Sequence, residues 1–96
     1  MNIGQFREAT IDLSPNLLLL LPQKNYFIPI TNLRFSENNL TMFKSATANR
    51  SLSLQQFFKL TENLPQVTNL FIQLDQSSPP QLMFGFRMLD HAIVPY

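Results

Sequence analysis

The chain contains the segment Ser53-Leu54-Gln55-Gln56-Phe57-Phe58-Lys59-Leu60-Thr61-Glu62-Asn63-Leu64, and 51 residues earlier it reads Asn2-Ile3-Gly4-Gln5-Phe6-Arg7-Glu8-Ala9-Thr10-Ile11-Asp12-Leu13. Gln, Phe, Thr and Leu recur in register in the two segments. Each segment opens with a good N-cap residue and has Gln three positions later, which is the spacing of a capping box. The apolar residues of each fall on one helical stripe. The two segments therefore predict two equivalent amphipathic helices.

Strand signals follow each predicted helix. The apolar run 17–21 is short and uniform, which predicts a strand covered on both faces. The stretch 26–35 is rich in aromatic and β-branched residues but is interrupted by Pro29, which indicates an edge position or a bulge. Residues 36–39 predict a tight hairpin connection into a strand at 40–43. Each helix is thus expected to be followed by three strands.

The second half shows the same order of signals. Residues 69–74 alternate as a half-buried strand, and residues 82–88 predict a long strand with Gly85 at a bulge or a close backbone approach. With an offset of 53, Arg34 matches Arg87 and Glu37 matches Asp90. The sequence predicts one domain, 1–96, made of two repeats, 2–43 and 53–94, joined by a linker at 44–52.

The predicted fold class is α+β. Two αβββ repeats would place two helices on one face of a single antiparallel sheet of about six strands. The expected core consists of the inward-facing apolar residues of both repeats: Ile3, Phe6, Leu13, Leu18, Leu20, Leu33, Leu54, Phe57, Leu64, Leu70, Ile72, Phe84 and Phe86.

A resemblance rests on the opening Ile-Gly-Gln-Phe-Arg-Glu-Ala, the stop Leu13-Ser14-Pro15, the apolar strand, the segment Asn25-Tyr26-Phe27-Ile28-Pro29-Ile30 and the closing hairpin. This pattern resembles small uncharacterised proteins of bacteriophage and prophage genomes. The likeness covers residues 2–43 and, more loosely, 53–94. It implies an α+β fold and a phage or mobile-element origin, and it supplies no catalytic residues.

Composition excludes several kinds of chemistry. The 96 residues include no cysteine, so disulfides and thiol catalysis are excluded. The net charge is +1 and charged residues make up only 14% of the chain, with the basic residues scattered, which disfavours a phosphate-backbone binder. No apolar stretch is long enough to cross a bilayer. We expect a cytoplasmic protein, in the host cytoplasm if it is phage-encoded, with no membrane partner.

Catalytic, metal and cofactor sites are not expected. His91 is the only histidine, and a residue of a hairpin turn is its simplest interpretation. The two glycines, Gly4 and Gly85, cannot form a phosphate-binding loop. The six acidic residues show no spacing that indicates an acid–base pair rather than a solvated surface. The sequence therefore predicts a protein that is not an enzyme.

The most specific functional feature is the recurrence of Arg34 and Arg87 at equivalent strand positions. They would flank a symmetric partner site, or each would pair with its own turn acid, Glu37 or Asp90. The expected partner-binding residues are Arg34, Arg87, Phe71, Met83 and Tyr96.

The low surface charge and mixed apolar sheet residues predict contact with another chain, by a sheet edge or an outer face. The expected function is a non-enzymatic protein–protein interaction module, a phage or mobile-element accessory protein or inhibitor, that forms a homodimer or binds another protein. The alternative is a nucleic-acid-associated module that uses a sheet face with Arg34 and Arg87.

Overall fold

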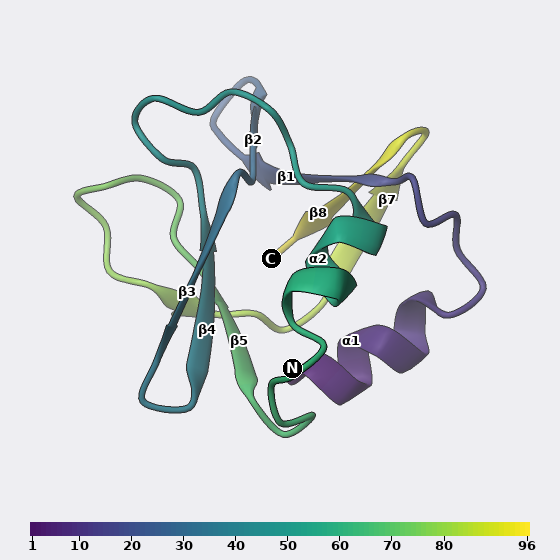
Figure 1. Ribbon diagram of the computed structural model, residues 1–96. Coiled ribbons are helices and arrows are strands. Elements are labelled where there is room, and N and C mark those ends of the chain that lie inside the picture. The colour runs from purple at the N-terminus through teal and green to yellow at the C-terminus, as the bar shows by residue number, and fades with distance from the viewer.

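Two helices and eight strands form two four-stranded sheets in the computed structural model, which describes residues 1–96 (Figure 1). The strand orders are β2-β1-β8-β7 in the first sheet and β3-β4-β5-β6 in the second. Figure 1 shows β3, β4 and β5 on the left, β1, β7 and β8 at the upper right, and both helices on the right-hand side. The elements are α1 (Ile3–Thr10), β1 (Leu18–Pro22), β2 (Phe27–Pro29), β3 (Asn32–Ser36), β4 (Asn39–Phe43), α2 (Leu54–Leu60), β5 (Asn69–Ile72), β6 (Gln81–Leu82), β7 (Phe86–Leu89) and β8 (Ala92–Pro95).

Both predicted capping boxes are present. In α1 the Gln5 N–H donates to Asn2 Oδ1 at 2.8 Å, and the Asn2 N–H donates to Gln5 Oε1 at 2.8 Å. In α2 the corresponding bonds join Ser53 and Gln56 at 2.8 and 3.1 Å. Reciprocal bonds of this kind satisfy amides that a helix start leaves without partners. The start of each helix is therefore determined by its local sequence.

The α+β class is confirmed, but the single antiparallel sheet of about six strands is wrong. The chain leaves the first sheet after Pro29 and enters the second at Asn32, so the expected strand 26–35 is divided between two sheets. Pro29 has no N–H to continue a ladder, and Ile30, with 0% exposure, fills the core at the crossing. Met83, also 0% exposed, makes the equivalent crossing between β6 and β7. The long strand expected at 82–88 is therefore also broken.

Each sheet combines two strands from each half of the chain. The pair at the centre of each sheet is parallel, β1 with β8 and β4 with β5, and the outer pairs are antiparallel. The residue pairing is the same in the two sheets. A residue of β1 corresponds to the residue 51 positions later in β5, and a residue of β2, β3 or β4 corresponds to the residue 53 positions later in β6, β7 or β8. Three pairs and their counterparts illustrate this: Leu20–Pro29 with Phe71–Leu82, Arg34–Thr41 with Arg87–Val94, and Leu40–Leu70 with Ile93–Leu19.

The core draws on both halves. Phe6 of α1 and Phe57 of α2 contact each other at its centre, with ring centroids 5.4 Å apart. Burial of this kind of apolar surface is the main favourable contribution to folding. The 14 residues of the core are Ile3, Phe6, Leu17, Leu19, Leu21, Ile30, Leu40, Met42, Leu54, Phe57, Leu70, Ile72, Met83 and Ile93.

Three residues of the expected core lie elsewhere. Leu18 and Leu20 point outward, because Leu19 and Leu21 are the inward residues of β1, with 0% exposure. The strand is therefore covered on one face and not on both. Phe84 is 74% exposed because it lies in the segment that crosses between the sheets. Leu13, Leu33, Leu64 and Phe86 are partly buried at the margin of the core.

The predicted hairpin at 36–39 is confirmed. Glu37 and Asn38 join β3 to β4 and have φ values of 53° and 66°. Positive φ at both central residues defines a type I′ turn, the geometry that suits the twist of a two-residue hairpin. Residues 44–52, the expected linker, contain no helix or strand.

Candidate functional site

Arg34 and Arg87 occupy equivalent positions on different sheets. Arg34 lies in β3 of the second sheet and Arg87 in β7 of the first. Each guanidinium lies over an aromatic ring, Arg34 over Phe43 at 4.9 Å and Arg87 over Tyr96 at 5.7 Å from the centroid. The two arginines therefore do not share a sheet face.

Neither arginine pairs with the acid of its own turn. The ion pair of the chain joins Lys59 to Glu62, at 3.4 Å on the surface of α2. Arg34 instead donates through Nη2 to Gln73 Oε1 at 3.0 Å. The interpretation of Arg34 and Arg87 as partners of Glu37 and Asp90 was wrong, because neither guanidinium has a carboxylate oxygen within 4.0 Å and each lies over an aromatic ring instead.

Phe71 is brought together with Arg34. Both line a shallow depression of about 310 Å³ on the outward side of the second sheet. Polar side chains dominate this surface, and Phe71 is its only half-buried ring. The depression is lined by Arg34, Ser36, Glu37, Asn39, Thr41, Phe71 and Pro80.

Met83 cannot contact a partner of the folded chain. Its side chain is 0% exposed within the core, and its carbonyl oxygen accepts a hydrogen bond from the N-terminal ammonium of Met1 at 2.7 Å. The expectation that Met83 faces outward failed because the chain crosses between the sheets at this residue, which changes the alternation of side chains.

Tyr96 lies across Gly85. The Tyr96 N–H donates to the Gly85 carbonyl at 3.0 Å, and the N–H groups of Phe84 and Gly85 both donate to the Tyr96 carbonyl, at 2.7 and 3.3 Å. Two successive donors on one carbonyl are the pattern of a β-bulge. A Cβ atom at Gly85 would lie 2.9 Å from Tyr96 Oη. Gly85 therefore permits the close approach that its position in the sequence predicted.

The outward sides of the two sheets differ in polarity. We define the first outer face as Leu18, Leu20, Arg87, Leu89, Ala92, Val94 and Tyr96, the outward residues of β1, β7 and β8 and the residue after β8. Across its middle runs the row Leu89–Ala92–Leu18, and the register places Ser36–Asn39–Asn69 at the equivalent positions of the second sheet. Leu18 is 41% and Leu89 39% exposed. Along this row the first sheet presents Leu18 and Leu89 on either side of the buried Ala92, where the second sheet has polar residues.

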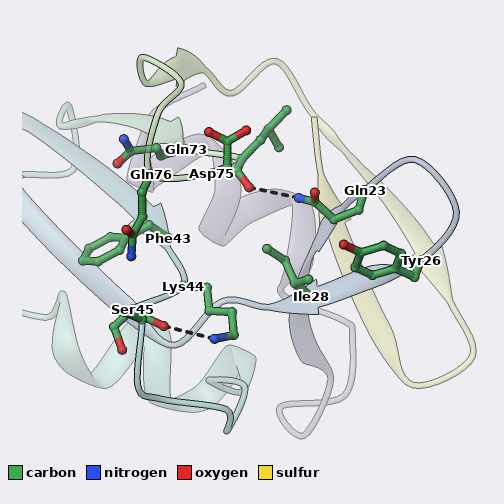
Figure 2. A pocket seen from close by; sticks show the side chains of 11 residues that line it. Gln23, Tyr26, Ile28, Phe43, Lys44, Ser45, Gln73, Asp75 and Gln76 are labelled. Atoms are coloured by element: carbon green, nitrogen blue, oxygen red, sulfur yellow. Dashed lines mark hydrogen bonds between the residues drawn. The ribbon is translucent and has the colours of Figure 1, made fainter.

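A pocket of about 220 Å³ lies where segments of both sheets meet (Figure 2). One wall comes from the β1–β2 turn and β2, a second from the end of β4 and the residues after it, and a third from the segment after β5. Gln23 Nε2 donates to the Leu74 carbonyl at 2.9 Å and joins two of these walls. The lining residues are Gln23, Tyr26, Ile28, Phe43, Lys44, Ser45, Ala46, Gln73, Leu74, Asp75 and Gln76.

The pocket contains one half-buried cation. Lys44 Nζ donates to the Ser45 carbonyl at 3.1 Å and has no carboxylate within 4.0 Å. In Figure 2 the Tyr26 side chain extends from the right toward the space between Gln23 and Ile28. Tyr26 and Gln76 also line the pocket, and both side chains are exposed.

Asp75 lines the same pocket, but its carboxylate is already engaged. It accepts hydrogen bonds from the Ser77 hydroxyl at 2.7 Å, the Ser77 N–H at 2.8 Å and the Ser78 hydroxyl at 2.9 Å. The Ser77 hydroxyl bond, followed by that of Ser78, lowers the pKa of Asp75 below its ordinary value of 3.8. Figure 2 shows this carboxylate directed away from Lys44, on the opposite side of the pocket.

No protein-family model, curated protein or solved structure matches this chain. Neither helix has the length and apolar character needed to cross a membrane. No three residues among the histidine and the acids are grouped so that they could hold a metal ion. His91 is exposed in the turn between β7 and β8, where its carbonyl accepts a hydrogen bond from the Leu18 N–H at 3.0 Å.

Sequence reasoning did not find the pocket. Its walls come from residues 23–28, 43–46 and 73–76, which have the patterns of turns, linker and strand ends. Nothing in those patterns indicates that the three segments meet. Lys44 carried the only available signal, as a cation directly after a strand with no acid nearby in the sequence.

Proposed function

We propose that the protein is a non-enzymatic protein–protein interaction module that binds its partner through the first outer face. The observation that carries this proposal is the apolar row Leu89–Ala92–Leu18, set against the polar row at the same positions of the second sheet. Leu18 and Leu89 are the exposed side chains of this row, and neighbouring exposed apolar side chains are typical of interaction sites.

Comparison of the two sheets shows whether the fold itself requires apolar residues on the outward side. The second sheet has the same strand order and register as the first, and it carries Ser36, Asn39 and Asn69 on its outward side. A sheet of this geometry therefore does not need apolar outward residues to form. Leu18 and Leu89 are exposed at a cost in solvation that the fold does not require, and burial by a partner would recover it.

The size of the face limits the affinity. Three strands about 4.8 Å apart, each contributing four residues that rise about 3.3 Å, cover roughly 190 Å². A standard interface buries about 800 Å² on each partner. A stable complex would therefore extend beyond the face, over the edge strand β7, where Met88 is 48% exposed. A second copy that docks on this face alone would bind weakly.

The test replaces the apolar residues with those of the other sheet. Leu18→Asn copies Asn69 and Leu89→Ser copies Ser36, so both substitutions are compatible with the register. We expect the wild type to show concentration-dependent self-association by light scattering and sedimentation, and the double variant to be monomeric.

The matched control changes two equally apolar residues elsewhere. Ile11→Gln with Val67→Asn removes side chains that are each 75% exposed and lie outside the first outer face. This control should associate as the wild type does. If the control and the face variant behave alike, or if the wild type is monomeric and binds no protein through this face, the proposal is wrong.

The nucleic-acid alternative has less support. It requires Arg34 and Arg87 on one surface, whereas they lie on different sheets. It would regain support from a gel shift that weakens steeply with salt and is lost in the Arg34→Ala, Arg87→Ala double variant.

Two further proposals concern origin. We propose that residues 2–43 and 53–94 descend from one duplicated unit, which is supported by the shared element order and the recurrence of strand pairs at shifts of 51 and 53. We also propose an accessory or inhibitory role for a phage or mobile element in the host cytoplasm, on the resemblance described above.

A further inference from the structure

We propose that the pocket around Lys44 binds a carboxylate attached to a small apolar group. A free carboxylic acid and the carboxyl terminus of a peptide both present this chemistry. The inference goes beyond the first outer face, because none of the residues that define that face lines the pocket.

The cation argues for an anionic ligand. Lys44 is half-buried, and one hydrogen bond to the Ser45 carbonyl leaves two of its three N–H donors free. The carboxylate of Asp75 is held by Ser77 and Ser78, so no resident acid neutralises this ammonium. A partly desolvated cation of this kind gains a strong charge-assisted hydrogen bond when an anion enters.

The number and type of donors favour a carboxylate over a phosphate. Phosphate sites gather arginines, several backbone N–H groups or a helix N-terminus. This pocket has one ammonium, the Tyr26 hydroxyl and the Gln76 amide. The one ammonium supplies the single positive charge that a carboxylate requires. The Gln76 amide can also serve an amide group beside the carboxylate, as in an acylated amino acid.

The remaining walls set the size and polarity of the ligand body. Ile28, Phe43 and Leu74 supply apolar surface, and each is half-buried. A cavity of about 220 Å³ holds the volume of roughly seven waters at about 30 Å³ each. This space accommodates a carboxylate with an aliphatic side chain the size of leucine.

The test is a titration of the ¹⁵N-labelled full chain followed by amide chemical shifts. N-acetyl-leucine is the probe, and N-acetyl-leucinamide, which has the same body without the charge, is its control. We expect the acid to shift the resonances of residues 23–28, 43–46 and 73–76. The amide should bind at least about tenfold more weakly, because hydrogen bonds to charged groups contribute at least that factor.

Two lysine variants test whether Lys44 is the cation that binds the ligand carboxylate. Lys44→Met should weaken binding of the acid about tenfold and leave binding of the amide unchanged. Lys24→Met is the matched control, because Lys24 follows Gln23 in the sequence, is exposed and does not line the pocket. Its acid affinity should stay within a factor of two of the wild type, as expected for a screened surface charge.

A five-residue peptide ending in leucine, with a free or an amidated carboxyl terminus, distinguishes the two sources. Tighter binding of the free-acid peptide than of N-acetyl-leucine would assign the pocket to protein chain ends. Binding of the small acid alone would assign it to a free carboxylic acid.

Three results would overturn the inference: equal affinity for acid and amide, shifts outside the three segments, or no shifts from any of these probes up to about 20 mM, a concentration that reveals even a weak site. The Leu18→Asn, Leu89→Ser variant should bind N-acetyl-leucine like the wild type. The proposal for the pocket and the proposal for the first outer face can therefore be refuted independently.

Discussion

Phe6 and Phe57 hold equivalent positions in α1 and α2, and they pack against each other edge to face, with centroids 5.4 Å apart and ring planes at 83°. Both are 0% exposed. Phe6 also contacts Phe58 at 5.6 Å and Phe86 at 5.5 Å. The two halves of the chain therefore meet through the same residue of each, at the centre of a cluster of four aromatic rings.

Phe57→Ala should lower the free energy of unfolding by about 3–5 kcal/mol, the range for truncation of a fully buried phenylalanine. Chemical denaturation monitored by circular dichroism measures it. Phe84→Ala is the control: its ring is 74% exposed, so the change should stay within about 0.5 kcal/mol. Equal losses in the two variants would contradict the position of Phe57 at the centre of the core.

Removal of either helix cap should destabilise the whole chain. Ser53→Ala and Asn2→Ala each delete a side-chain acceptor for the N–H of the third helical residue, and we expect a loss of about 1 kcal/mol in each case. Thr47→Ala, an exposed position without a side-chain hydrogen bond, should change the stability by less than about 0.5 kcal/mol. A cap variant as stable as the Thr47 variant would show that the capping box does not contribute to the stability of the chain.

Gly85→Ala should destabilise the wild type but not a Tyr96→Ala background. A methyl group at Gly85 would lie 2.9 Å from Tyr96 Oη, so the ring must move away and leave its contact with Arg87. Without the ring, the substitution should be neutral or stabilising by up to about 1 kcal/mol, because alanine restricts the unfolded chain. A double-mutant cycle by thermal unfolding measures the difference. A coupling energy of zero would exclude the contact.

The carboxyl group of Asp75 should titrate below its ordinary value of 3.8, because Ser77 and Ser78 donate to the ionised form. In the unfolded chain these bonds are lost, so ionised Asp75 stabilises the fold above the unfolded pKa. This contribution is lost as the pH falls through the depressed folded pKa. Carboxyl ¹³C titration should show the pKa of Asp75 rising in the Ser77→Ala variant. An unchanged pKa would exclude the Ser77 hydroxyl as the main cause.

Local features of the fold could be predicted because local residues determine them. Asn2 with Gln5 and Ser53 with Gln56 identify both helix starts, and the Ser36–Asn39 turn identifies its hairpin. Each of these features depends on residues only three positions apart.

Long-range features could not be predicted. Residues 17–21 are all leucine, so alternation gives no indication of which side of β1 faces inward. Pro29 indicated an interruption, but no local signal shows that the chain there passes to another sheet. The pocket around Lys44 depends on three segments whose encounter follows from that crossing.

The exchange of strands between the halves has a consequence for how the molecule can come apart. Residues 2–43 alone contain β1 and β2 of one sheet and β3 and β4 of the other, so each sheet would end in an open central edge. A single half severed from its companion has no closed core of its own. We expect one cooperative transition on denaturation, and we expect fragments cut at residues 44–52 to regain structure only when mixed.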